Sequence, residues 1–195
     1  MSDFVHLHTH SHYSMLDSCC KIPDLIQAAK EHHMPAVALT DYANLFGVPE
    51  FYSLAKKNGI RPIIGMEAYL NENHQAKNYL NYHLVLFAAN IEGYRNLMAL
   101  ATAAYMDGFY YKPRIDKELL RRHSAGLIGT SACIKGEIPQ RLLYGKYSDA
   151  RTLAESYAEI FNGRFYIEIQ RHALPIEKKL NRRLVRLAND LRLPL

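Results

Sequence analysis

Histidine side chains gather near the start of the chain, in the run His6-Leu7-His8-Thr9-His10. If residues 4–8 form a strand, His8 and His10 lie at its end and point to the same side, because they are two residues apart. Two imidazoles a few ångströms apart supply half of the ligands of a typical zinc site. The pair therefore predicts a metal site, and the alternative is that both are simply polar residues at a strand end.

Further side chains that bind metals recur where later predicted strands end. Glu67 is the most informative, since a carboxylate inside an apolar run needs a partner and a metal would supply one. A mixture of nitrogen, oxygen and sulfur donors suits zinc, manganese or iron. Ligands from several strands would suit a hydrolytic site for phosphate esters, although Asp17 can equally be a turn or helix-capping residue. The candidates in chain order are Asp17, Asp41, Glu67, Cys133 and His172.

Short β-like runs alternate with helical stretches, a pattern that predicts βα units and a parallel sheet. Residues 71–81 and 108–114 are expected to be loops. Six strands and a stub of a seventh at 193–195 predict an incomplete βα barrel, with an open doubly wound sheet as the alternative. The expected strands cover residues 4–8, 36–39, 62–70, 83–88, 126–129 and 165–169. The expected helices cover residues 22–32, 49–57, 91–105, 116–122, 139–144, 148–161 and 175–191.

Length and composition indicate one globular domain without a membrane span. The chain has 195 residues, a net charge of +5 and three cysteines. The odd cysteine count argues against a disulfide framework, and the first residues, Met1 to Phe4, do not resemble a signal peptide. We therefore expect a cytoplasmic protein. Its positive charge is only a mild bias toward polyanions.

Several runs together resemble one family, the PHP (polymerase and histidinol phosphatase) superfamily, and in particular its branch in bacterial DNA polymerase III alpha subunits. The match extends over nearly the whole chain in the expected order, so it is more specific than any single motif. The first run, residues 7–11, resembles the first motif of the superfamily. The others that resemble the polymerase branch are residues 13–17, 40–47, 59–69, 108–116 and 168–172.

The resemblance implies an α/β fold, a distorted seven-stranded (βα)7 PHP-type barrel, here truncated before the last strand. Residues 1–195 would form this one domain, incomplete at its C-terminal end and without the polymerase palm, thumb and fingers. Tyr42 stands where the nuclease-competent pattern has a histidine, so that ligand position is degenerate. His172 matches no ligand place. The resemblance fills six of nine ligand places, with His8, His10, Asp17, Glu67, His83 and Cys133.

Family members that lose ligands tend to keep the domain as a scaffold. We therefore expect mainly a structural and partner-docking module, bound to the rest of the polymerase subunit and in some cases to a proofreading exonuclease subunit. The alternative is an active metal-dependent 3′–5′ exonuclease or phosphoesterase. A generic basic barrel that binds nucleic acid is a third reading, but it leaves the histidine pair unexplained.

Aromatic and basic residues alternate in the run from Phe109 to Arg114. Surfaces that bind single-stranded nucleic acid combine these residue types. Tyr110, Lys112 and Arg114 are therefore candidate contacts for DNA. The alternative is a loop packed against the barrel.

Overall fold

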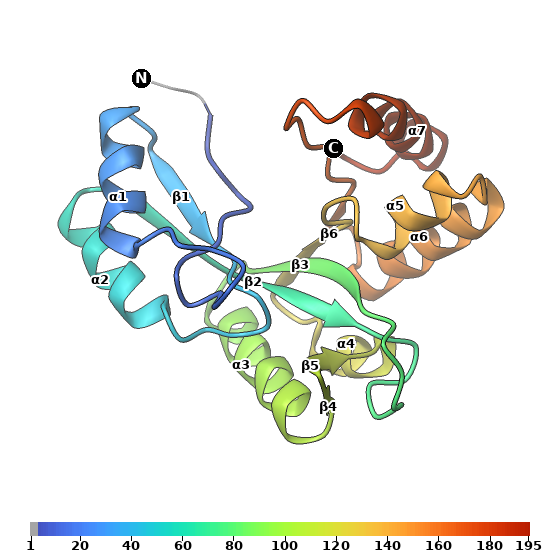
Figure 1. The fold of residues 1–195 in the computed structure, drawn as a ribbon, viewed down its shortest axis with the longest axis horizontal. Helices are drawn as coiled ribbons and strands as arrows, with labels where there is room; N and C mark the ends of the chain where they lie inside the picture. The colour runs from blue at the N-terminus through green and yellow to red at the C-terminus, as the bar shows by residue number, and fades with distance from the viewer. Residues whose placement is uncertain (1–3) are drawn as a thin grey trace.

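A computed structural model describes residues 4–195 of the chain (Figure 1). The first three residues, on which the expectation about a signal peptide partly depends, lie outside this part. The strands are β1 (Ala36–Leu39), β2 (Arg61–Leu70), β3 (Tyr82–Ala88), β4 (Phe109–Tyr110), β5 (Lys112–Ile115), β6 (Leu127–Thr130) and β7 (Phe165–Tyr166). The helices are α1 (Ile22–Glu31), α2 (Val48–Lys57), α3 (Ile91–Met106), α4 (Lys117–His123), α5 (Glu137–Leu143), α6 (Tyr147–Phe161) and α7 (Pro175–Leu191).

The predicted helices all form, and local signals explain where several begin. Pro23 occupies the first turn of α1, where a missing N–H costs nothing. The Asn90 side chain accepts a hydrogen bond from the Gly93 N–H at the start of α3, and Asp116 caps α4 in the same way. The helix predicted over residues 175–191 has those bounds in the structure.

The expectation of a parallel sheet is only partly correct. The strand order is β4-β5-β2-β3-β6-β7, and β1 pairs with the first half of β2. The β1–β2, β2–β5 and β6–β7 pairs are parallel, whereas β3 runs antiparallel to both β2 and β6. The reason is the connection: the chain passes from β2 to β3 through residues 71–81, which contain no helix that could carry it back for a parallel strand.

The predicted first strand at residues 4–8 does not form a regular ladder. Two backbone bonds hold this segment beside β1, from Ala38 N–H to the His6 carbonyl (2.9 Å) and from Thr40 N–H to the Thr9 carbonyl (2.8 Å). The Thr9 hydroxyl also donates to the Ala38 carbonyl, so a side-chain bond adds to the backbone bonds between this segment and β1. The segment is extended and docked, but it is not a strand.

The sheet is not closed within residues 4–195, and neither the seven-stranded barrel nor its truncation before the last strand is confirmed. The expected stub at 193–195 is not a strand. One backbone hydrogen bond joins it to the segment after β7, from the Ile167 N–H to the Pro194 carbonyl (2.9 Å). A groove of about 1050 Å³ separates the first segment from the end of the chain, with Leu7, His8, Ile167, Glu168 and Leu195 among its lining residues. In Figure 1 the dark-blue segment that precedes α1 and the dark-red C-terminal part of the chain lie apart, and both contribute residues to this groove.

Residues 108–114 are not a plain loop, because β4 and β5 form a short antiparallel hairpin there. Tyr111 lies at its tip in the left-handed region, at φ 60°. Gly108 precedes the hairpin at a position where a Cβ atom would lie 2.0 Å from the Arg114 carbonyl oxygen. The close approach of the two backbones therefore requires glycine.

Two of the three hydrophobic clusters among residues 4–195 pack helices against the sheet. One packs α1 and α2 against β1, through Ile22, Val37 and Phe51. The larger cluster joins β2 and β3 to the five later helices, with Leu97 and Leu184 among its members. No helix among residues 4–195 combines the length and apolar character needed to cross a bilayer.

Candidate metal site

The carboxylate of Glu67 is the centre of a polar cluster inside the molecule. Glu67 is fully buried in β2. Its Oε2 lies 2.7 Å from His8 Nε2 and 2.6 Å from His10 Nε2, and its Oε1 lies 2.6 Å from His83 Nδ1. Three imidazoles therefore converge on one carboxylate.

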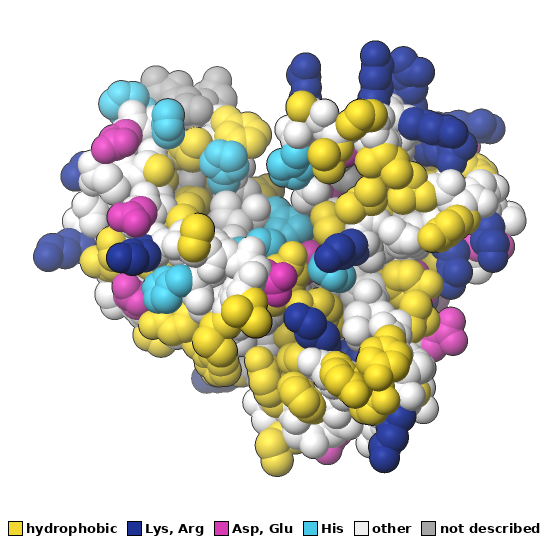
Figure 2. Space-filling model, in the orientation of Figure 1, with side chains coloured by type: hydrophobic (Ala, Val, Ile, Leu, Met, Phe, Trp, Pro, Cys, Tyr) yellow, Lys and Arg dark blue, Asp and Glu magenta, His cyan; other side chains and the backbone are white. Residues whose placement is uncertain are grey.

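Sheet register and strand ends bring these side chains together. Tyr69 pairs with His83 across the β2–β3 ladder, so Glu67, two residues earlier in β2, lies on the same face as His83. Cys133 follows the end of β6, and its Sγ lies 3.8 Å from both Glu67 Oε1 and His83 Nδ1. Figure 2 shows histidine side chains gathered at the hollow between the N-terminal and C-terminal helices.

The donor atoms form two groups that share Glu67. His8, His10 and Glu67 make one group, and Glu67, His83 and Cys133 make the other, with all donor atoms of each group within 4.8 Å of one another. Imidazole nitrogen, carboxylate oxygen and thiolate sulfur are the donors that zinc and similar transition metals take. The residues present therefore fit a metal ion, with Glu67 able to bridge two positions.

Electrostatics in the cluster favour charged His8 beside ionised Glu67. Burial opposes the charged imidazole, but hydrogen bonds to Glu168 and Glu67 outweigh it and raise the pKa of His8 to about 10. Burial also opposes the ionised Glu67 carboxyl, yet its three histidine partners hold the pKa of that group far below its usual range. Burial, reinforced by the Glu67 charge, raises the pKa of the Cys133 thiol to about 11.

Tyr42 occupies the degenerate position by stacking on the ligands. Its ring lies 4.2 Å from the His10 ring with planes 10° apart, and 5.6 Å from the Tyr69 ring with planes 7° apart. Burial, followed by the Glu67 charge, raises the pKa of the Tyr42 phenol above its usual value. A neutral phenol packed in this way fills the space beside His10 without offering a strong ligand.

Asp17 does not join the cluster, although the resemblance places it among the ligands. It belongs to neither donor group among residues 4–195. Its side chain is 48% exposed and lies 3.8 Å from Lys112 Nζ. Leu16, directly before it, lies in the left-handed region at φ 69°.

Asp41 is buried for a structural reason. Its carboxylate accepts hydrogen bonds from the Ser11 N–H and hydroxyl, both at 2.7 Å, and from the Ser14 hydroxyl at 2.6 Å. These bonds fix the turn that follows His10. Asp41 thus shapes the loop beside the site and does not contribute a donor to it.

The C-terminal candidate, His172, lies away from the cluster. Glu168, four residues earlier in the sequence, contacts the cluster instead. The His172 ring is 65% exposed and donates to the Glu177 carboxylate. Glu168 Oε1 lies 2.7 Å from His8 Nδ1. Our residue-by-residue reading missed Glu168, although the signal was present: a carboxylate in the predicted strand 165–169 needs a partner just as Glu67 does.

The three candidate nucleic-acid contacts do not form one surface. The prediction that Arg114 contacts DNA is wrong, because the residue is 1% exposed and its guanidinium donates to backbone carbonyls. Tyr110 is half-buried in the hairpin, and its ring lies 4.8 Å from that of Tyr111, which is exposed. Lys112 is 46% exposed and lies 5.2 Å from the centre of the Tyr69 ring.

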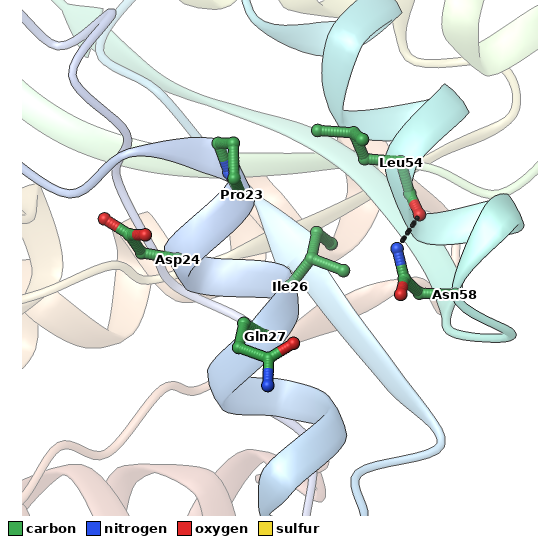
Figure 3. Close-up of a pocket in the computed structure, with 6 residues that line it drawn as sticks. All are labelled: Pro23, Asp24, Ile26, Gln27, Leu54 and Asn58. Carbon is green, nitrogen blue, oxygen red and sulfur yellow. Dashed lines mark hydrogen bonds between the residues drawn. The ribbon is translucent and has the colours of Figure 1, made fainter.

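A smaller hollow of about 300 Å³ lies between α1 and α2 (Figure 3). Asp24 and Gln27 contribute its polar side chains together with Asn58, whose amide donates to the Leu54 carbonyl at 2.9 Å. The described residues that line it include no histidine or cysteine. The chemistry of the molecule is therefore concentrated at Glu67 and along the larger groove.

Comparisons with known proteins identify relatives of this chain. The chain is 46% identical over its whole length to DNA polymerase III subunit alpha of Borreliella burgdorferi, covering 17% of that protein. It is 44% identical, over 95% of its length, to DNA polymerase III subunit alpha of Helicobacter pylori, covering 16% of it. The chain thus spans about one sixth of the length of these curated relatives.

A solved structure from Bifidobacterium adolescentis, described as a candidate metal-dependent phosphoesterase, has a similar fold. The TM-score is 0.58 at 15% identity, and the match covers 97% of this chain and 84% of the other. The family model described as "PHP domain" matches residues 6–172. This match covers most of the chain, including the segments that carry His8, Glu67 and Cys133, and the chain therefore belongs to the PHP domain family.

Proposed function

We propose that this chain is the PHP domain of a bacterial DNA polymerase III alpha subunit and acts there mainly as a structural and partner-docking module. Identity above 40% to alpha subunits over nearly the whole chain supports the assignment. Polymerisation of DNA belongs, in this proposal, to the rest of the subunit. That remainder is the first expected partner, followed by a proofreading exonuclease subunit and DNA.

The stacked ring of Tyr42 is the observation that carries the structural role. It packs flat on His10 where the nuclease-competent pattern places another imidazole. Glu67 in turn binds three histidines directly, so the cluster has internal partners without a cation. A network satisfied in this way can hold the first segment, β2 and β3 together whether or not metal is bound.

The residues that would hold a divalent ion are His8, His10, Glu67, His83 and Cys133, and we propose zinc, manganese or iron. When bound, such an ion would activate water and neutralise phosphate charge. The protein's own part is positional: β2 and β3 hold Glu67 and His83 on one face, and Cys133 approaches from the end of β6. With Asp17 outside the cluster and Tyr42 in place of a histidine, we expect weak occupancy.

A nuclease assay tests the structural role. We expect the chain, given zinc or manganese and a 3′-recessed DNA duplex, to release nucleotides no faster than its Glu67→Gln variant. Glu67→Gln is the matched control because it removes the central charge and keeps the side-chain shape. Release that is metal-dependent, and that the Glu67→Gln change abolishes, would overturn the structural role.

The second candidate function, a metal-dependent 3′–5′ exonuclease or phosphoesterase, is favoured by one observation. Two donor groups share the Glu67 carboxylate, which is how a site with two metal ions is bridged. The likeness to the candidate phosphoesterase supports the fold alone. The nuclease assay separates the two functions.

The proposal includes a completing strand beyond Leu195. Pro194 already accepts one backbone bond beside β7, and Leu195 lines the open groove. An unpaired sheet edge exposes backbone groups and invites association. A chain extended through this strand should therefore unfold at a higher urea concentration than residues 1–195, and equal midpoints would contradict the proposal.

We also propose a limited DNA contact at the hairpin tip, through Tyr110 and Lys112 but without Arg114. Tyr79, Tyr110 and Tyr111 form one ring cluster there, with centroids 4.8 to 5.6 Å apart. Tyr79 and Tyr111 are more than 60% exposed. Exposed aromatic rings beside a lysine match the combination that binds single strands by stacking and charge.

A further inference from the structure

Glu168 contacts His8 on the side opposite to Glu67. Its Oε1 lies 2.7 Å from His8 Nδ1, while Glu67 Oε2 lies 2.7 Å from His8 Nε2. We propose that Glu168 is the positioning residue of the metal site: it fixes the His8 ring so that Nε2 faces the other donors. This inference rests on the proposed metal site and names a residue that sets its affinity.

Glu168 is itself held rigidly. The Thr130 hydroxyl donates to its Oε2 at 2.5 Å, and the Gln170 amide donates to its Oε1 at 2.7 Å. Its backbone N–H donates to the Ser131 hydroxyl at 2.9 Å. The carboxylate is therefore a fixed acceptor, held from the end of β6 and from the segment after β7.

A fixed acceptor on one ring nitrogen decides what the other nitrogen can do. With the Nδ1 proton donated to Glu168, Nε2 is the atom left to bind a cation once its own proton is released. A carboxylate on the outer nitrogen also makes the imidazole a stronger donor. Among residues 4–195, His8 is the one histidine of the donor set with both ring nitrogens on carboxylates.

The same contact crosses the open side of the sheet. His8 belongs to the first segment and Glu168 to the segment between β7 and α7, and both line the large groove. The orientation of His8 therefore depends on the correct placement of the segment after β7. Glu67 and His83 do not share this dependence, because both lie within the β2–β3 ladder.

Zinc affinity tests the proposal. On the chain of residues 1–195, the zinc dissociation constant is measured by competition with a chromogenic chelator for the parent, Glu168→Gln and Thr130→Val. Glu118→Gln is the matched control, since its side chain is 67% exposed on α4. We expect Glu168→Gln to weaken zinc binding about 10- to 100-fold, the range found for such outer partners, and Thr130→Val to weaken it less.

Proton NMR on the metal-free chain gives a second measurement that does not need zinc. The His8 Nδ1 proton should appear as a slowly exchanging low-field signal in the parent and disappear in Glu168→Gln, while circular dichroism stays unchanged. If the parent binds no zinc but shows this difference, the metal site fails and the positioning stands. An unchanged Nδ1 signal, or a zinc affinity like that of Glu118→Gln, overturns the positioning role.

Discussion

His8 and Glu168 are separated by 160 positions in sequence, yet their side chains form a hydrogen bond 2.7 Å long. The bond joins the first extended segment to the segment after β7, across the groove where the described sheet is open. His8 simultaneously contacts Glu67 in β2. One histidine thus links the first segment to β2 and to the segment after β7, so the geometry of the site depends on the placement of all three.

The charge on His8 should make the metal-free protein less stable at alkaline pH. The fold raises the pKa of His8 to about 10, from 6.5 for an unperturbed histidine side chain. Because the folded value is the higher one, the stabilisation is complete below about pH 6.5 and is lost as pH rises toward 10. In EDTA we expect the free energy of unfolding to fall by on the order of 3 kcal/mol across this window, as measured by urea denaturation.

The His8→Gln variant isolates this contribution. Cys133, with its pKa raised to about 11, also destabilises the folded protein as it ionises, so some decline remains at the upper end of the window. The parent should nevertheless lose more stability than His8→Gln between pH 6.5 and 10. Parallel curves for the two proteins would show that His8 is not charged in the fold.

Arg114 should be a stability residue and not a DNA contact. Its guanidinium donates to the carbonyls of Gly108, Asn78, His74 and Ala76, which ties residues 74–78 to the hairpin. Arg114→Leu leaves these carbonyls without a donor, and we expect a loss of about 3 kcal/mol in the free energy of unfolding.

Arg114→Lys should recover only part of this loss, since one ammonium cannot reach all four carbonyls. Arg121→Leu, at a side chain 52% exposed on α4, is the control and should change stability by less than about 0.5 kcal/mol. If Arg114→Leu unfolds at the same urea concentration as the parent, the hydrogen bonds of this guanidinium do not stabilise the fold.

The hairpin tip should account for binding of single-stranded DNA, if the chain binds it. We expect Tyr110→Ala to weaken binding of a thymidine oligonucleotide about 5-fold or more, because each stacked base contributes about 1–3 kcal/mol. Lys112→Gln should lower the dependence of affinity on salt by about 0.7 in the logarithmic slope. Fluorescence anisotropy at several salt concentrations measures both effects.

Tyr52→Ala is the control for this surface, because Tyr52 is a 48% exposed tyrosine on α2. It should bind the oligonucleotide as the parent does. If Tyr52→Ala and Tyr110→Ala lose the same affinity for the oligonucleotide, any exposed aromatic residue binds it equally well. That result would contradict a specific contact at the hairpin tip.

Local signals in the sequence were sufficient for the helices and for the centre of the site. Pro23, Asn90 and Asp116 mark helix starts by chemistry that acts within one turn. The His8 and His10 pair and the carboxylate of Glu67 were nominated by residue type and spacing, although His8 lies in a segment that does not form the predicted strand. Composition alone gave no preference between a barrel and an open sheet.

Features that depend on distant contacts were not predictable in this way. The antiparallel direction of β3 depends on how residues 71–81 connect it to β2, and the placement of residues 4–8 depends on bonds to β1, far along the chain. The partly exposed Asp17 carboxylate lies 3.8 Å from Lys112 Nζ, which is far from it in the sequence. The partner of Glu168 lies 160 residues away, at a distance over which sequence periodicity carries no information.

We propose that Tyr42 weakens the metal site of a structural domain, and the metal content of the purified protein tests this. The parent chain and Tyr42→His are purified side by side, exposed to equal zinc and manganese, desalted and subjected to elemental analysis. We predict well below one equivalent of metal in the parent and at least one equivalent in Tyr42→His. One or more equivalents of tightly held metal in the parent would contradict the claim and favour the nuclease.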